Sequence, residues 1–196
     1  MNRIAKRMTV ILAGVVLVSC AGSTPPRTQY LLRAEPVERS VRVRAPVHVG
    51  LGRVVVAPYL HQSGIVVETE ASQVRAARQH QWAEPLEAGL RSYLRAEISN
   101  ALGYEVSADR ADRPHWDYAV DVHIDRLHGT MTGTAVIDAS YRITPRAASK
   151  QATEYRFSRS TSLPRDGYPG LVEAEAGLAR ELAAAIAASL RDLGGS

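Results

Sequence analysis

The sequence predicts an α/β fold: a two-layer sandwich in which two helices pack on one face of a mixed, largely antiparallel sheet. Two segments, 85–103 and 170–194, carry apolar residues at helical spacing. Three consecutive segments between 117 and 161 instead alternate apolar and polar residues, and glycines or short polar runs separate them. The apolar face of each helix must be covered, and the sheet offers the matching surface.

Residues 1–19 have the layout of a secretory signal peptide. A basic opening with Arg3, Lys6 and Arg7 precedes an apolar run from Met8 to Val18. This run has about eleven residues, whereas a helix needs roughly 20 to cross a bilayer. The run is therefore too short to be a membrane span.

Cys20 is the only cysteine in the chain, and it stands where the apolar run ends. The sequence LVSC (17–20) resembles the lipobox of bacterial signal peptidase II. The resemblance implies that Cys20 is lipidated, becomes the first residue of the mature protein, and carries enough acyl chains for stable anchoring. The alternatives are a plain signal peptide with an incidental cysteine and a cysteine buried in a cytosolic core.

Charge and cysteine content exclude several classes of function. Three of the 24 basic residues precede Cys20, so 21 basic and 20 acidic side chains remain in the mature chain. This near neutrality argues against a nucleic-acid partner, which requires a basic face. Because no cysteine follows Cys20, disulfides, thiolate metal sites and cysteine nucleophiles are excluded as well.

The mature chain is predicted to contain a tether and one domain. Residues 20–29 form a lipidated tether, because the stretch after Cys20 is small, polar and proline-bearing with no apolar period. A loop packed on the domain is the alternative reading. Residues 30–196 suit a single periplasmic α/β domain with a sizeable core.

The first half of the domain is predicted to contain three strands and a helix. The strands are YLLRAEPV (30–37), VHVGLGRVVVAPYL (47–60, stopped by Pro58) and GIVVETE (64–70). The helix has Pro85 in its first turn and ends at Gly103. Its apolar face consists of Leu86, Leu90, Tyr93, Leu94, Ile98 and Leu102.

The second half is predicted to be a meander followed by a helix. A short strand, YEVSA (104–108), comes before the alternating strands 117–129, 133–144 and 153–161. The closing helix runs from about Gly170 to Gly194, with an apolar face of Leu171, Leu178, Leu182, Ile186 and Leu190. His128, beside Gly129, is predicted to be a turn residue.

The best candidate for a reactive cluster is Asp121, His123 and Asp125, whose residue types suit zinc. On a strand, however, residues two apart lie ~6.5 Å apart and three in a row span ~13 Å, which is too wide for one ion. A solvated sheet face is the better interpretation. Hydrolase, metalloprotease and nucleotide motifs are absent from the sequence, so we predict no enzyme and no catalytic, cofactor or metal residues.

Trp82 precedes the first helix, and two interpretations are open. The side chain either fastens the helix to the sheet or protrudes to anchor a partner. The position directly before a proline-started helix favours the first.

The order of motifs resembles the PqiC-type family, the auxiliary lipoproteins of ABC-type transport systems. The resemblance rests on LVSC, YLL, VVVAPYL, GIVVETE and above all WAEPLEAGL (82–90), and it covers nearly the whole mature chain. It implies a non-enzymatic, outer-membrane, periplasm-facing lipoprotein that accompanies an MCE-domain protein in envelope lipid transport and membrane integrity. Ala21, rather than an aspartate, after Cys20 fits sorting to the outer membrane.

The same resemblance suggests where a partner binds. Partner-binding candidates are Tyr59, His61, Gln62 and Trp82, although HQSG (61–64) departs from the family's usual turn. The sequence leaves open whether the chain forms homo-oligomers. Two other functions compete: an outer-membrane assembly or peptidoglycan-synthase-activating lipoprotein, and an envelope hydrolase that uses the Asp121, His123 and Asp125 face.

Overall fold

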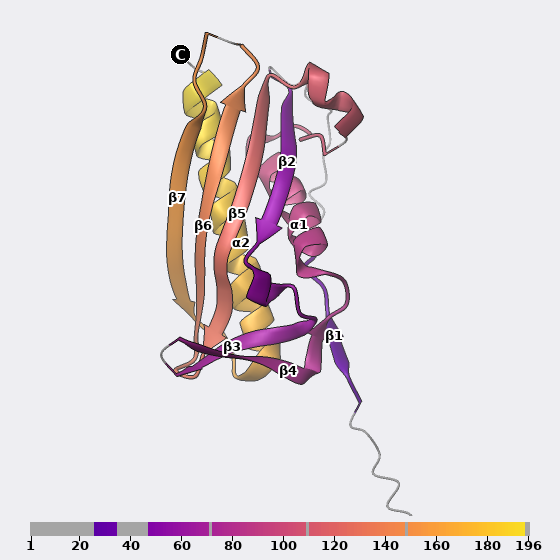
Figure 1. Ribbon diagram of the computed structural model, residues 1–196, viewed down its shortest axis with the longest axis vertical. Coiled ribbons are helices and arrows are strands. Elements are labelled where there is room, and N and C mark those ends of the chain that lie inside the picture. Colours follow the sequence, from indigo (N-terminus) through magenta and orange to yellow (C-terminus); the bar gives the residue numbers. More distant parts are fainter. Residues whose placement is uncertain (1–25, 35–46, 71, 109, 148, 195–196) are drawn as a thin grey trace, which may run out of the picture.

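A computed structural model describes residues 26–34, 47–70, 72–108, 110–147 and 149–194. The predicted signal peptide and Cys20 lie outside them. The described chain forms one mixed sheet of seven strands with two helices on one face, which confirms the predicted fold class (Figure 1).

The strands are β1 (Thr28–Tyr30), β2 (Val49–Val56), β3 (Gly64–Glu70), β4 (Gln73–Trp82), β5 (Tyr118–Thr130), β6 (Thr134–Pro145) and β7 (Thr153–Ser162). Their order is β1-β4-β3-β5-β6-β7, and β2 also pairs with β5. The predicted meander is confirmed as β5, β6 and β7, which pair antiparallel. The pairs β1–β4, β2–β5 and β3–β5 are parallel.

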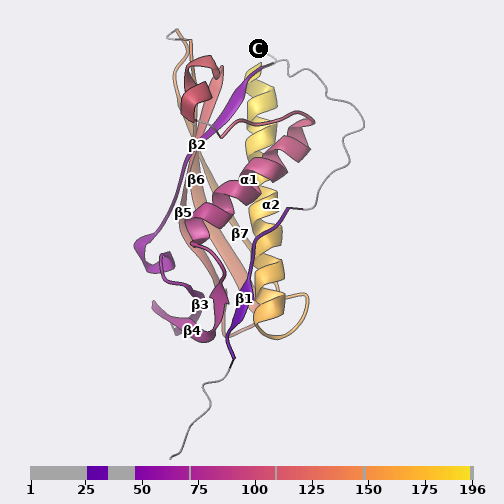
Figure 2. The same ribbon diagram turned by 90° about the vertical axis from the view of Figure 1, so that its right-hand side faces the viewer.

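Both long helices, α1 (Leu86–Leu102) and α2 (Gly167–Gly194), lie on the same side of the sheet (Figure 2). Helix α1 begins directly after Pro85 and ends at Gly103, whose φ of 80° is accessible to glycine without strain. The predicted apolar faces of both helices are buried, apart from Leu102, which is half-buried. Helix α2 starts three residues earlier than predicted.

Tyrosine hydroxyls connect helix α2 to helix α1 and to the sheet. Tyr93 of α1 donates to the Ala176 carbonyl oxygen at 3.0 Å, and Tyr118 of β5 donates to the Leu193 carbonyl oxygen at 3.1 Å. On β6, the Tyr141 hydroxyl lies 2.9 Å from Ser189 Oγ. Each ring therefore buries apolar area while its polar end keeps a partner on α2.

One strand was missed, and three local predictions were wrong. Strand β4 was not predicted, because Gln73–Trp82 lacks apolar alternation; it is stabilised by pairing with β3 and β1 instead. The strand predicted from residue 30 is the short β1, which begins at Thr28 within the predicted tether and does not continue over Leu31–Ala34. In the predicted strand 104–108, only Ser107 bridges to Gly50.

His128 is also not a turn residue, since it is buried within β5. The pairing of β5 with β6 slips between Ile124 and Arg126, which marks a β-bulge. After this bulge the buried side chain is Leu127 rather than residue 126. Unbroken alternation would place Arg126 on the buried face, so the bulge changes which side chains face the core near the end of this strand.

Trp82 lies in the hydrophobic core at the end of β4, where it is 7% exposed. Its backbone N–H donates to the Ser63 carbonyl oxygen at 2.8 Å, and the residue pairs with Tyr30 of β1. We predict that Trp82→Ala lowers the free energy of unfolding by about 3–5 kcal/mol, as truncation of large core aromatics does.

Denaturant unfolding of the chain without residues 1–20 measures this effect. As a control, Met131→Ala, at a turn residue that is 65% exposed, should change stability by less than about 0.5 kcal/mol. A Trp82→Ala chain as stable as the control would contradict the core role of Trp82.

Glu175 of α2 is a carboxylate buried in the interior. The residue is 1% exposed, and its Oε2 atom has no hydrogen-bond partner. Burial raises the pKa of Glu175 from 4.5 to about 8, because the charged form is poorly solvated there. The folded chain therefore keeps a proton that the unfolded chain loses.

This raised pKa predicts a pH dependence of stability. The contribution is fully present below pH 4.5 and is lost as pH rises towards about 8. We predict that Glu175→Gln removes a slope of up to about 1.4 kcal/mol per pH unit in that range. Unfolding measured from pH 4.5 to 8.5 tests this against Glu173→Gln, an exposed position on the same helix. Equal slopes in both variants would contradict it.

Candidate functional site

The motif PYL forms the short 3-10 helix η1 (Pro58–Leu60), directly after β2. The proline presets the backbone, and the Leu60 N–H donates to the Ala57 carbonyl oxygen at 2.9 Å. Ala57 is itself held to β5 through the Ile124 carbonyl oxygen at 2.9 Å, and Leu60 is buried in the core. We call η1, the turn 61–63 and the adjacent Arg126 and His128 of β5 the η1 corner.

Tyr59 joins η1 to β5. Its ring meets His128 edge-on, with the ring centroids 6.1 Å apart. Its hydroxyl is buried without a hydrogen bond of good geometry, although the Leu127 backbone is near. Burial raises the pKa of Tyr59 despite the opposing influence of Arg126, so this side chain stays a neutral part of the corner.

His61 and Gln62 are exposed on the turn after η1. His61 Nε2 lies 3.9 Å from Glu87 Oε2 on α1, and Gln62 Nε2 donates to the Tyr59 carbonyl oxygen at 2.7 Å. Of the four partner-binding candidates, the structure thus brings Tyr59, His61 and Gln62 together. Trp82 is buried, and its backbone N–H holds the end of the turn through its bond to the Ser63 carbonyl oxygen.

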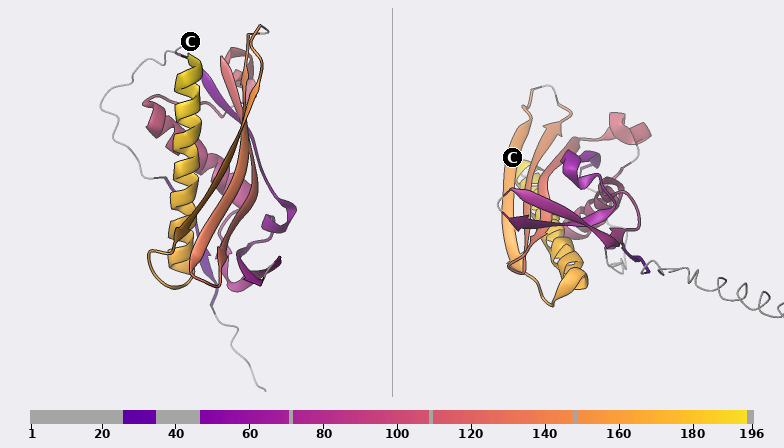
Figure 3. Two further views of the ribbon diagram at one scale, coloured as in Figure 1. Left: turned by 90° about the vertical axis from the view of Figure 1, so that its left-hand side faces the viewer. Right: turned by 60° about the horizontal axis from the view of Figure 1, so that its bottom comes forward.

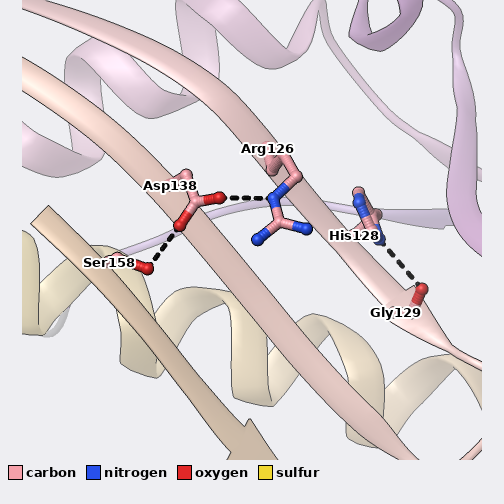
Figure 4. Close-up of polar contacts among 5 residues, drawn as sticks. All are labelled: Arg126, His128, Gly129, Asp138 and Ser158. Carbon is pink, nitrogen blue, oxygen red and sulfur yellow. Dashed lines mark hydrogen bonds and ion pairs between the residues drawn. The ribbon is translucent and has the colours of Figure 1, made fainter. Parts of the chain in front are cut away.

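A chain of polar contacts crosses the sheet beside this corner (Figure 4). Arg126 of β5 forms an ion pair with Asp138 of β6, and Ser158 of β7 donates to Asp138 Oδ1 at 2.5 Å. His128 Nδ1 lies 3.1 Å from the Gly129 carbonyl oxygen. These contacts fasten three neighbouring strands where β5 leaves its regular register.

The contacts around Asp138 and Arg126 favour the charged forms of both side chains. Burial opposes ionisation of Asp138, but the bonds from Ser158 and Arg126 outweigh it and hold the pKa of Asp138 below 3.8. The same ion pair raises the pKa of Arg126. Both groups are therefore charged near neutral pH.

Arg126 and His128 were missed as site residues by sequence reasoning. A signal for them exists in HIDRLHG (123–129), where the apolar spacing lengthens from two to three residues between Ile124 and Leu127. Such a change in spacing is typical of a β-bulge, in which one extra residue changes the face to which the following side chains point.

The face with Asp121, His123 and Asp125 has structural contacts. Asp121 Oδ1 accepts the Arg53 N–H at 2.7 Å, at the irregular step of β2. His123 Nε2 lies 3.1 Å from Asp125 Oδ1, and both side chains are about half exposed. Among the described residues, no group of three or more such side chains could hold a metal ion.

This geometry predicts a graded response to alanine substitution. His123→Ala and Asp125→Ala should change the free energy of unfolding by less than about 0.5 kcal/mol. Asp121→Ala should cost about 1 kcal/mol, because the Arg53 N–H loses its acceptor. Denaturant unfolding of the three variants tests the order. Stoichiometric zinc in protein purified without added metal, absent from His123→Ala, would contradict the structural interpretation.

None of the helices in the described part of the chain is both long and apolar enough to cross a bilayer. Cys20, the predicted lipidation site, lies outside that part.

Comparison with known proteins agrees with the resemblance seen in the motifs. The intermembrane transport lipoprotein PqiC of Escherichia coli (strain K12) is 24% identical over 189 residues, which make up 96% of this chain and 99% of PqiC. PqiC of Shigella flexneri matches to the same extent.

Two solved structures share the fold. A crystal structure of an uncharacterized protein is 25% identical, with a TM-score of 0.71 over 84% of this chain and 99% of that one. The protein XCC0632 from Xanthomonas campestris is 14% identical, with a TM-score of 0.65 over 82% of this chain and 92% of its own.

A family model described as ABC-type transport auxiliary lipoprotein component matches residues 30–187, from β1 into the last turns of α2. The match spans α1, the whole meander and most of α2. The chain therefore belongs to the family of auxiliary lipoprotein components of ABC-type transport systems.

Proposed function

We propose that this protein is an outer-membrane-anchored, periplasm-facing subunit that docks an MCE-domain protein of an ABC-type lipid transporter. The observation that carries the proposal is the family match over residues 30–187. The PqiC relatives are named intermembrane transport lipoproteins, which supports a role between two membranes. The lipobox at Cys20 supports the anchor.

The η1 corner is the docking surface in this proposal. Leu60 is buried and Tyr59 is half-buried, whereas His61, Gln62 and Ser63 are exposed on the turn between them and β3. Bonds at both ends hold this turn: Ala57 to β5, and Trp82 to Ser63. A preorganised turn loses little conformational entropy on binding, which favours docking at this surface.

Co-purification tests the proposed partner. The full-length lipoprotein, extracted from membranes with an affinity tag, should retain an MCE-domain protein. We expect His61→Ala with Gln62→Ala to weaken that retention by roughly five- to thirtyfold, because a few central residues dominate most interfaces. The melting temperature should not change, since both side chains are exposed.

The double substitution Arg53→Ala with Arg156→Ala, at exposed positions on β2 and β7, serves as the control and should retain the partner. Recovery of a β-barrel assembly protein or a peptidoglycan synthase in place of an MCE-domain protein would contradict the proposal.

A second prediction concerns the anchor. Cys20→Ala should abolish incorporation of an acyl-chain probe and leave an uncleaved or mislocalised precursor, because the chain has no other cysteine. Metabolic labelling followed by membrane fractionation measures both. Label that persists in the variant would rule out this anchor, and mature protein in the inner-membrane fraction would rule out the proposed location.

A further inference from the structure

A polar, cationic hollow lies where β1, β4 and the turn after η1 meet. It has a volume of about 540 Å³. Its lining residues are Arg27, Gln62, Ser63, Gly64, Ala76, Ala77, Arg78, Gln79 and Gln81. None of them carries a carboxylate, so the two arginines give the hollow a positive charge.

The hollow follows from an irregularity in the β3–β4 hairpin. Gly64 pairs with Gln81, but the next paired residues are Val66 and Ala76, so four residues of β4 stand opposite one of β3. Gly64 makes this close approach possible, because a Cβ atom there would lie 2.3 Å from the Ala77 carbonyl oxygen. Three of the four extra residues, Ala77 to Gln79, line the hollow together with Gly64.

Arg27 and Arg78 have exposed side chains, and neither forms an ion pair within the described part of the chain. Arg126, Arg142 and Arg165 each pair with a neighbouring carboxylate, whereas Arg53 and Arg156 resemble Arg27 and Arg78 in forming no ion pair among the described residues. Two unpaired guanidinium groups beside three glutamine amides form a donor-rich surface that suits phosphate oxygens.

The position of the hollow points to the membrane. Strand β1 and the β3–β4 hairpin lie at the end of the molecule opposite the C-terminus (Figures 1 and 3). Arg27 directly precedes β1 and is seven residues from Cys20. Seven residues span at most about 25 Å, so a lipid on Cys20 would keep the hollow close to the bilayer surface.

We infer that this hollow binds the phosphate groups of anionic lipids in the membrane that carries the anchor. The inference rests on the proposed lipidation of Cys20. Each arginine near an anionic surface strengthens binding about fivefold. The tether keeps the hollow at high effective concentration, so even this modest attraction orients the domain. The hollow would thereby hold the η1 corner, whose Gln62 and Ser63 line one side of it, beside the bilayer surface.

Hydrogen–deuterium exchange of the lipidated full-length protein in nanodiscs tests the inference. Exchange at Ala77–Gln79 should be slower in phosphatidylcholine discs with phosphatidylglycerol than in phosphatidylcholine alone. Raising the salt from about 0.05 to 0.5 M should abolish the difference, because the Debye length shortens severalfold. The substitutions Arg27→Gln with Arg78→Gln should also abolish it.

The matched control is Arg53→Gln with Arg156→Gln, which removes the same charge from exposed positions elsewhere on the sheet and should keep the slower exchange. Equal exchange in both kinds of disc would overturn the inference. So would exchange that slows only when a soluble MCE-domain protein is added, since the hollow would then bind protein. The discs contain no partner protein, so the exchange experiment tests lipid binding alone. Its failure would not contradict the docking proposal, and failure of the co-purification would not contradict lipid binding by the hollow.

Discussion

The β-bulge at Asp125 is the constraint on which much of the structure depends. Before it, β5 pairs with β2 and buries Val120, Val122 and Ile124 against the helices. Past the bulge, the end of β5 pairs with β3, and the buried position passes to Leu127. The same edge of β5 therefore pairs in parallel with β2 and then with β3. The bulge bends β5 between these two pairings. The helix η1 lies in the connection between β2 and β3.

The bulge also explains the chemistry of the corner. It places Arg126 and His128 beside η1, where the ring of His128 meets Tyr59 and the charge of Arg126 is balanced by Asp138. Both charged side chains are partly exposed, and Ser158 donates to the second carboxylate oxygen of Asp138. Glu175, by contrast, has an unpartnered oxygen in the interior and remains protonated at neutral pH. The polar groups of β5 to β7 beside the exposed turn are thus mostly paired with one another.

Sequence patterns predicted the elements whose burial is periodic. Helix α1 between Pro85 and Gly103, helix α2 and the meander all follow one apolar face. Strand β4 could not be predicted, because Arg75, Arg78 and Gln79 stand on an exposed strand that depends on pairing with β3 and β1 rather than on burial. Of the candidate site, Tyr59, His61 and Gln62 were predicted from a motif, whereas Arg126 required knowledge of the bulge. The hollow at Gly64 could not be predicted, because it depends on the shifted register between β3 and β4.

The most direct test of the docking account is site-specific photo-crosslinking in intact cells. A photoreactive amino acid in place of Gln62, on the exposed turn of the η1 corner, should yield a covalent adduct with an MCE-domain protein. The same residue in place of Arg156, on exposed β7, should yield none. An adduct from position 156 but not from position 62 would contradict the account, as would adducts from position 62 with other envelope proteins alone.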